Sequence, residues 1–244
     1  MRMKRKGRLL LVLGIVFLVL AGGIAWSQVT ERVSVDTTGS DADSASSNPS
    51  TSSNGSYEAF QSDATDLVAG GSNGSMHIFV RDRQTPTTTQ VSVDSAGNEA
   101  NAASSSPSIS SDGRYVAFES DADNLLGVGN DTNGWPNVFV HDRDADGDGM
   151  YDEAGEVSTI RVSVYSDETE SIDPSNNPSI SADGGCVTFQ SDANNLLGVG
   201  NDNNGAPDVF ADDLQAGAGG GGGGGGGCFI ATAADGSGMA GEVK

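Results

Sequence analysis

Short apolar and β-branched runs alternate with polar, glycine-containing turns along most of the chain. One such pattern occurs three times, over residues 49–60, 107–118 and 178–189. In each copy an Asx-Gly pair separates two strand-like runs; the pairs are Asn54-Gly55, Asp112-Gly113 and Asp183-Gly184. Asx-Gly tolerates the positive φ that both central residues of a primed turn need. Each copy is therefore predicted to form a β-hairpin with a tight two-residue turn.

Two further strands are predicted per copy. The third covers residues 76–81, 137–141 and 208–211, and the fourth is a Val-Ser-Val run at 33–35, 91–93 and 162–164. Four meandering strands in about 58 residues is the content of one β-propeller blade. The sequence predicts an all-β fold of three four-stranded, propeller-type repeats, with no helix after residue 27.

The order of these strands leaves the array incomplete at both ends. The chain has a lone fourth strand before its first hairpin and no fourth strand after its third repeat, so the two ends could share a blade. Closed propellers use four to eight blades. Three blades would stay open or associate, and one hypothesis is a homodimer that completes a six-bladed ring.

The repeated motif resembles a known family. Each copy reads approximately Pro-x-x-Ser, Asp-Gly-x-x-x-Ala-Phe, Ser-Asp and x-Val-Phe-Val-x-Asp-Arg, and this pattern looks like the TolB-like propeller repeat of exported bacterial proteins over residues 28–214. The resemblance implies a scaffold for protein contacts, in a family most of whose members have no known activity. The first copy departs from the pattern, because Glu58 stands where the later copies have Val116 and Val187.

The second interval between copies carries an acidic insertion of 13 residues. Counted from Asp144, acids stand at positions 1, 3, 5 and 9 and Gly149 at position 6, as in the first half of an EF-hand-type calcium loop. The predicted Ca²⁺ ligands are Asp144, Asp146, Asp148, the Met150 carbonyl, Asp152 and Glu153. Gly155 stands where position 12 needs a bidentate Glu, so Glu153 or Glu156 would have to substitute; the alternative is a solvated acidic loop.

Catalytic motifs are scarce. His77 and His141 are both expected to be exposed strand residues, and no nucleophile stands in a recognisable hydrolase motif. The Ser-Asp pairs at 62–63, 120–121 and 191–192 and the Asn-rich loops at 130–133 and 201–204 are expected to hold loop amides. The chain is therefore predicted not to be an enzyme. A hydrolase would need the acids between Asp121 and Asp131 to bind a catalytic metal.

The amino-terminal end predicts export. Five of the twelve basic residues lie within residues 1–8, and an apolar run follows to residue 26, which indicates a signal peptide over residues 1–27. With 34 acidic residues in the chain, the remainder is strongly acidic and repels phosphate backbones, so nucleic acid is not an expected partner. The expected location is the periplasm, the cell surface or the medium. Contact with a membrane would need an uncleaved leader or a processed tail.

The carboxyl-terminal end changes composition abruptly. Residues 215–227 form a glycine-rich linker, and residues 228–244 begin Cys-Phe-Ile-Ala-Thr-Ala-Ala, which resembles the CFI-box tail of exported bacterial proteins. That resemblance implies a sorting or display tail processed at Cys228; an inert remnant is the alternative. The only other cysteine, Cys186, stands where earlier copies have Tyr57 and Tyr115 and is expected to be a small buried filler, without a bridge to Cys228.

Two functions remain open on the sequence alone. The first is an exported, non-enzymatic propeller-repeat scaffold that binds a protein or surface ligand and carries one calcium loop. The second is a fragment of a larger propeller enzyme or envelope transport-linked protein.

Overall fold

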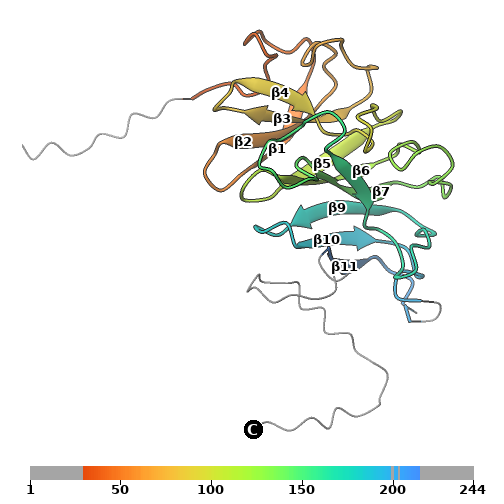
Figure 1. Ribbon diagram of the computed structural model, residues 1–244. Coiled ribbons are helices and arrows are strands. Elements are labelled where there is room, and N and C mark those ends of the chain that lie inside the picture. The colour runs from red at the N-terminus through yellow and green to blue at the C-terminus, as the bar shows by residue number, and fades with distance from the viewer. Residues whose placement is uncertain (1–29, 199–200, 203, 215–244) are drawn as a thin grey trace, which may run out of the picture. The chain divides into compact units, whose positions relative to one another are not determined.

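The computed structural model describes residues 30–198, 201–202 and 204–214, and all regular structure in this part is β-strand (Figure 1). The strands form three antiparallel sheets, each a meander of neighbouring strands. The first sheet is β1 (Ser46–Thr51), β2 (Tyr57–Ser62), β3 (His77–Asp82) and β4 (Thr87–Gln90). The second is β5 (Ser104–Ile109), β6 (Tyr115–Ser120), β7 (Asn137–Asp142) and β8 (Ser158–Arg161), and the third is β9 (Ser175–Ile180), β10 (Cys186–Ser191) and β11 (Asp208–Asp213). The predicted all-β fold of blade-like repeats is confirmed.

The middle of each sheet is held by one pair of stacked phenylalanines on neighbouring strands. The ring centroids of Phe60 and Phe79 lie 5.9 Å apart, and those of Phe118 and Phe139 lie 6.0 Å apart. Phe189 and Phe210 repeat the contact at 5.8 Å. The apolar runs at the second and third predicted strands thus become directly paired neighbouring strands.

The hairpins form where predicted, but their turns are longer than two residues. In the first hairpin the Ser52 N–H donates to the Tyr57 carbonyl at 2.9 Å and the Gly55 N–H to the Ser52 carbonyl at 3.0 Å, which leaves four residues in the loop. Gly55 has φ +65°, whereas Asn54 is not among the residues with positive φ. Asn54 instead accepts the Ser56 N–H through its side chain. The prediction of a two-residue primed turn was wrong.

The fourth strands lie just before the Val-Ser-Val runs. β4 and β8 end at Gln90 and Arg161, and only Val93 and Val164 of the following runs form isolated bridges. The alternation that predicted a strand does not place serine in solvent: Ser92 is fully buried, and its hydroxyl accepts the Ile78 N–H at 3.1 Å. The assignment of Val-Ser-Val as the fourth strand was therefore wrong by a few residues.

The two ends of the chain do not share a sheet through the first Val-Ser-Val run. Val35 bridges only to Asp41, and its carbonyl accepts the Thr88 hydroxyl of β4 at 2.6 Å, which places it beside the first sheet. Within the described residues the third sheet has three strands and ends at β11. The expectation of three four-stranded repeats thus holds for two of them.

Successive sheets pack through a tyrosine that covers a hairpin glycine. A Cβ placed on Gly113 would lie 2.2 Å from the Tyr57 ring, and one on Gly184 would lie 2.1 Å from the Tyr115 ring. Both glycines also have positive φ, at +87° and +72°. Each therefore has two independent reasons to be glycine. Apolar side chains extend the contact, in one cluster between the first two sheets and another between the second and third.

Hydrogen bonds across the two sheet interfaces repeat in the same positions. Ser50 Oγ accepts the Ile109 N–H at 3.2 Å, and Ser108 Oγ accepts the Ile180 N–H at 3.1 Å. A bulge residue with positive φ also donates its N–H each time, Ser106 to Gln61 Oε1 and Asn177 to Glu119 Oε2, both at 2.9 Å. The interfaces are thus copies of one arrangement.

The predicted leader, linker and tail lie outside the described residues, as does Cys228. Among the described residues no helix is long and apolar enough to cross a membrane. Cys186 is half-buried and disulfide-bonded. The expectation of an unbridged, buried filler was therefore wrong.

Candidate metal centre

The acidic insertion is a closed loop between β7 and β8. The Asp152 N–H donates to the Arg143 carbonyl at 2.8 Å, and the Ala145 N–H donates to the Glu156 carbonyl at 2.8 Å. These bonds bring both ends of the loop together beside the end of β7. The residues between them are thereby folded into a tight, mostly exposed turn.

Three of the predicted ligands converge. Each of Asp144, Asp146 and Asp148 offers a carboxylate oxygen, and these oxygens lie within 4.8 Å of one another. The Asp144 carboxylate is buried and accepts the Gly149 N–H at 3.3 Å, and Asp148 Oδ1 accepts the Met150 N–H at 2.8 Å. Gly149 has φ +89°, which bends the chain around the three acids. The alternating spacing thus produces the cluster that the sequence predicts.

Asp152 does not join these acids but pairs with Arg143. Arg143 Nε and Nη2 contact the two Asp152 carboxylate oxygens at 2.8 and 2.5 Å. The Arg143 guanidinium, 2% exposed, also lies 5.1 Å from the Tyr57 ring centroid and 5.0 Å from that of Tyr151. Its Nη1 donates to the Gly113 carbonyl at 2.8 Å. Asp152 therefore anchors the acidic loop to the interface between the first and second sheets.

Glu153 lies close enough to the acidic cluster to interact electrostatically with it. Desolvation, followed by the charges of Asp148 and Asp146, raises the pKa of Glu153. Arg114 approaches from the other side, with Nη1 at 3.7 Å from Asp144 Oδ2, while it forms a bidentate pair with Asp142. The hydrogen bond to Asp142 raises the pKa of Arg114. One permanent cation therefore offsets part of the negative charge of the cluster.

The arrangement suits a hard divalent cation. Ca²⁺ takes six to eight oxygen ligands in flexible geometry, and three converging carboxylates with a fourth acid nearby supply part of such a shell. Met150 follows the cluster directly, and its side chain is exposed. Among the described residues no other group of three potential metal ligands gathers in this way.

In the Ser-Asp pairs it is the serine side chain that hydrogen-bonds to the loop backbone. Ser62 Oγ accepts the Ala64 N–H at 3.1 Å and donates to the Ala45 carbonyl at 2.9 Å. Ser120 and Ser191 make the corresponding bonds to Ala122 and Ala193. The structural role expected for these pairs is confirmed, but the expected Asx turn is replaced by a serine hydroxyl.

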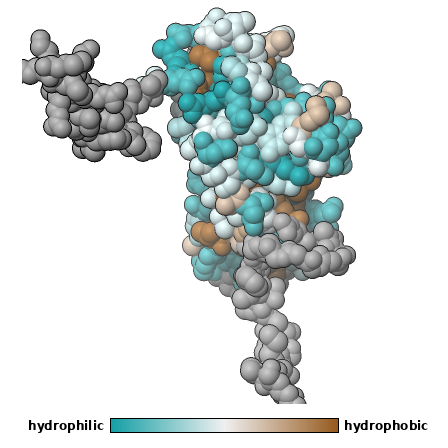
Figure 2. Space-filling view, turned by 60° about the vertical axis from the view of Figure 1, so that its left-hand side comes forward, coloured by the Kyte–Doolittle hydropathy of each residue, from teal (hydrophilic) through white to brown (hydrophobic). Residues whose placement is uncertain are grey.

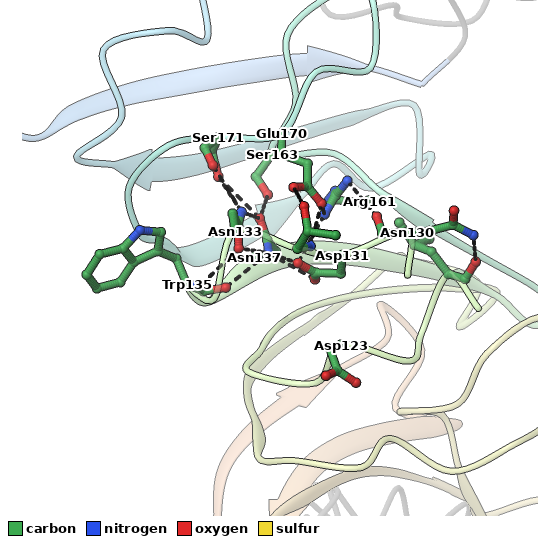
Figure 3. Close-up of polar contacts among 12 residues, drawn as sticks. Asp123, Asn130, Asp131, Asn133, Trp135, Asn137, Arg161, Ser163, Glu170 and Ser171 are labelled. Atoms are coloured by element: carbon green, nitrogen blue, oxygen red, sulfur yellow. Dashed lines mark hydrogen bonds and ion pairs between the residues drawn. The ribbon is translucent and has the colours of Figure 1, made fainter. Parts of the chain in front are cut away.

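A second polar cluster fills the loop before β7 (Figure 3). Arg161 Nη1 lies 3.4 Å from Asp131 Oδ1 and 2.9 Å from Glu170 Oε1. Asn137 donates to Asp131 at 3.1 Å and accepts the hydroxyls of Ser163 and Ser171. The indole of Trp135 points away from this cluster, and Asp123 lies apart from it. Asp131 is thus bound to an arginine, which does not suit the catalytic metal that a hydrolase would need there.

Both histidines are buried, contrary to expectation. His77 is 0% and His141 1% exposed. Desolvation lowers the pKa of His77, and burial lowers that of His141 to about 4. His77 contacts Ser92, Asn73 and Glu99, and His141 contacts Thr159 at 2.8 Å. Nothing in the sequence pattern distinguished them from exposed strand residues, because the hydroxyl partners Ser92 and Thr159 lie 15 and 18 residues further along the chain.

The fold and these sites define an all-β protein built from successive propeller-type blades. Solved structures with partial similarity include TolB from Acinetobacter baumannii, at 18% identity and TM-score 0.38, and putative TolB from Agrobacterium tumefaciens, at 18% and 0.39. The alignments cover 71% and 70% of this chain but 31% and 46% of those proteins. A prolyl endopeptidase structure aligns with 70% of this chain and 20% of its own, at 13% identity and TM-score 0.37.

The chain therefore spans less than half the length of these proteins. Neither a model of a known protein family nor the sequence of a curated protein matches it.

Proposed function

We propose that this chain is an exported, non-enzymatic scaffold of propeller-type blades that binds a protein or surface ligand, with a Ca²⁺-binding loop at residues 144–153. The observation that carries the calcium part is the convergence of the Asp144, Asp146 and Asp148 carboxylates within 4.8 Å. Glu153 and the Met150 carbonyl are the further ligands of this proposal. The basic and apolar sequence of residues 1–26 supports export.

The bound ion would stiffen the junction between the first two blades. Without a cation the three carboxylates and Glu153 repel one another, and after desolvation the charges of Asp148 and Asp146 contribute to the raised pKa of Glu153. The loop is tied through Asp152 and Arg143 to the Tyr57 ring of the first sheet. An ion that removes the repulsion therefore stabilises a loop that already spans the interface.

The expected gain in stability on Ca²⁺ binding follows from the affinity of the site and the Ca²⁺ concentration. Weak extracellular calcium sites have dissociation constants of about 10⁻⁴ to 10⁻³ M. At 10 mM Ca²⁺, taken as about ten to one hundred times that constant, binding to the folded state alone adds about 1.4–2.7 kcal/mol. For a domain of this size that corresponds to a rise in Tm of about 3–10 °C.

The test is calcium titration of residues 28–244 by calorimetry, with melting curves in parallel. Asp146→Asn/Asp148→Asn should abolish both the heat and the rise in Tm. The matched control is Asp121→Asn/Asp192→Asn, which removes two exposed carboxylates elsewhere and should bind Ca²⁺ like the parent. No heat in the parent, or equal binding in both variants, would refute the metal centre.

The non-enzymatic part is tested separately. Both histidines are buried among hydroxyl, amide and carboxyl groups, which supports a structural role for them. The purified chain should be inactive on panels of ester, glycan and phosphate substrates, with and without Ca²⁺. Turnover that disappears in Asp146→Asn/Asp148→Asn would show that the loop is catalytic and would overturn the scaffold proposal.

A further inference from the structure

One face of the third sheet exposes positions that the other sheets bury. Ile78 and Val138 are 0% exposed because the next sheet covers them, whereas Val209, in the same place on β11, is 78% exposed. Directly paired residues of neighbouring strands share a face. The register of β10 with β11 therefore assigns this open face to Cys186, Thr188, Gln190, Val209, Ala211 and Asp213.

The open face carries a covalent attachment point. Cys186 occupies the position of Tyr57 and Tyr115, whose rings cover the hairpin glycine of the next sheet. Cys186 is disulfide-bonded, and the sequence contains only one other cysteine, Cys228. Within a single chain, Cys228 is the one residue that could be its partner. Such a bond would bring the segment that begins at Cys228 beside the open face.

We propose that residues 228–234 of the same chain cover the open face of the third sheet. The segment reads Cys-Phe-Ile-Ala-Thr-Ala-Ala. Phe229 and Ile230 supply apolar surface for Val209 and Ala211, and the small residues allow a close approach to the strand. The segment has no acidic side chain, so it adds no negative charge beside Asp213, the acid of β11 that lies on the open face.

The linker permits this return. The Leu214 N–H donates to the Gly185 carbonyl at 3.0 Å, so the described chain ends next to Cys186. Residues 215–227 are mostly glycine, and 13 residues of such a chain have a root-mean-square span of about 20 Å. The tail therefore has to fold back over only a short distance.

A second copy of the chain is a less suitable occupant. Copies stacked end to end would place the first sheet's outer side on the open face. That side presents Glu58 and exposed Thr51 where the second sheet has Val116 and Ile109, and Arg83 Nη1 lies 3.4 Å from Glu58 Oε1. A polar outer side of this kind is typical of a capping repeat. The apolar tail segment matches the open face better.

The first test is peptide mapping of residues 28–244 purified without reductant. The proposal expects a Cys186–Cys228 linked peptide in a protein that is monomeric by light scattering. A free Cys228, a processed Cys228 or a link between two chains would overturn it. No residue of the proposed contact lies in the acidic loop, so this outcome is independent of calcium binding.

The second test separates covering from mere tethering. Hydrogen exchange of β11 is compared between the parent and Phe229→Asp/Ile230→Asp, which keeps both cysteines. We expect β11 amides to exchange about tenfold faster in the variant, while β6 and β7 stay unchanged. The matched control, Ser237→Asp/Met239→Asp, adds the same charge beyond the segment and should exchange like the parent. Equal β11 exchange in all three proteins would overturn the proposal, as would protection that is lost on dilution of a dimer.

Discussion

Replacement of Gly113 by alanine tests the tyrosine–glycine contact that orders the sheets. The new Cβ would lie 2.2 Å from Tyr57 Cδ2 and 2.6 Å from Cγ, distances that require the ring or the hairpin to move. Gly113 is itself buried, so the hairpin has little room to yield. The substitution also puts a non-glycine residue at φ +87°.

Two costs add in this variant. A left-handed conformation costs a non-glycine residue about 1–2 kcal/mol. Overpacking of a well-filled contact costs about another 1–3 kcal/mol. The expected loss is therefore about 2–5 kcal/mol, or a fall in Tm of about 4–20 °C for a domain of this size.

Gly55 provides a control for the cost of placing alanine at a positive φ. Gly55 has φ +65°, but the nearest atom to an added Cβ there is Arg83 Nη1 at 3.6 Å. Gly55→Ala should therefore lose only about 1–2 kcal/mol. In urea unfolding, the difference between the two alanine variants measures the ring contact.

A double variant completes the test. In Tyr57→Ala/Gly113→Ala the ring is gone, so the second substitution should cost only its backbone strain. If Gly113→Ala were no more destabilising than Gly55→Ala, or if its cost were unchanged without the Tyr57 ring, the proposed packing between the sheets would be refuted.

Three further predictions concern buried polar groups. Arg143→Met should lower the unfolding free energy by about 3–5 kcal/mol, because Asp152, which is 15% exposed, loses the arginine that it pairs with. Urea unfolding measures this loss, and a value near zero would contradict the pairing. The pKa of His141 is about 4 in the folded protein against 6.5 ordinarily, so the unfolded state binds more protons between these values. The unfolding free energy should fall by about 3 kcal/mol as the pH drops from 6.5 to 4. In His141→Gln this part of the pH dependence should be absent from unfolding curves recorded across the range. An unchanged pH dependence would contradict the role given to His141. Ser120→Ala should lower the unfolding free energy by about 1–3 kcal/mol, because the Ser120 hydroxyl bonds the loop. Asp121→Ala should leave it almost unchanged. If thermal melts showed the reverse order, the aspartate and not the serine would hold the loop.

The sequence was sufficient for the features that depend on local chemistry. The Asx-Gly pairs located the hairpins, and the aromatic runs located the strands that pair through stacked phenylalanines, because both signals lie within a few residues. The alternating acids also brought Asp144, Asp146 and Asp148 together, since a short loop with glycines at positive φ has few ways to fold.

Features that depend on contacts between residues far apart in the sequence could not be predicted from the sequence. The fourth strand β4 reads Thr-Thr-Thr-Gln, a polar run without an apolar pattern, and it forms because β3 offers it a partner edge. Asp152 looked like a fourth metal ligand, but Arg143 binds it bidentately, and spacing alone cannot show which of two charges an acid will meet. The buried His77 and His141 likewise bond to the hydroxyl groups of Ser92 and Thr159, which lie 15 and 18 residues further along the chain.

The second sheet carries both halves of the contact that joins the blades. Its Gly113 receives Tyr57 from the sheet before, and its Tyr115 covers Gly184 of the sheet after. If a gene segment encoding this sheet were duplicated in frame, the tyrosine–glycine contact would recur at each new junction. Duplication of the segment that encodes the middle blade could therefore lengthen the array while this contact between neighbouring blades is kept.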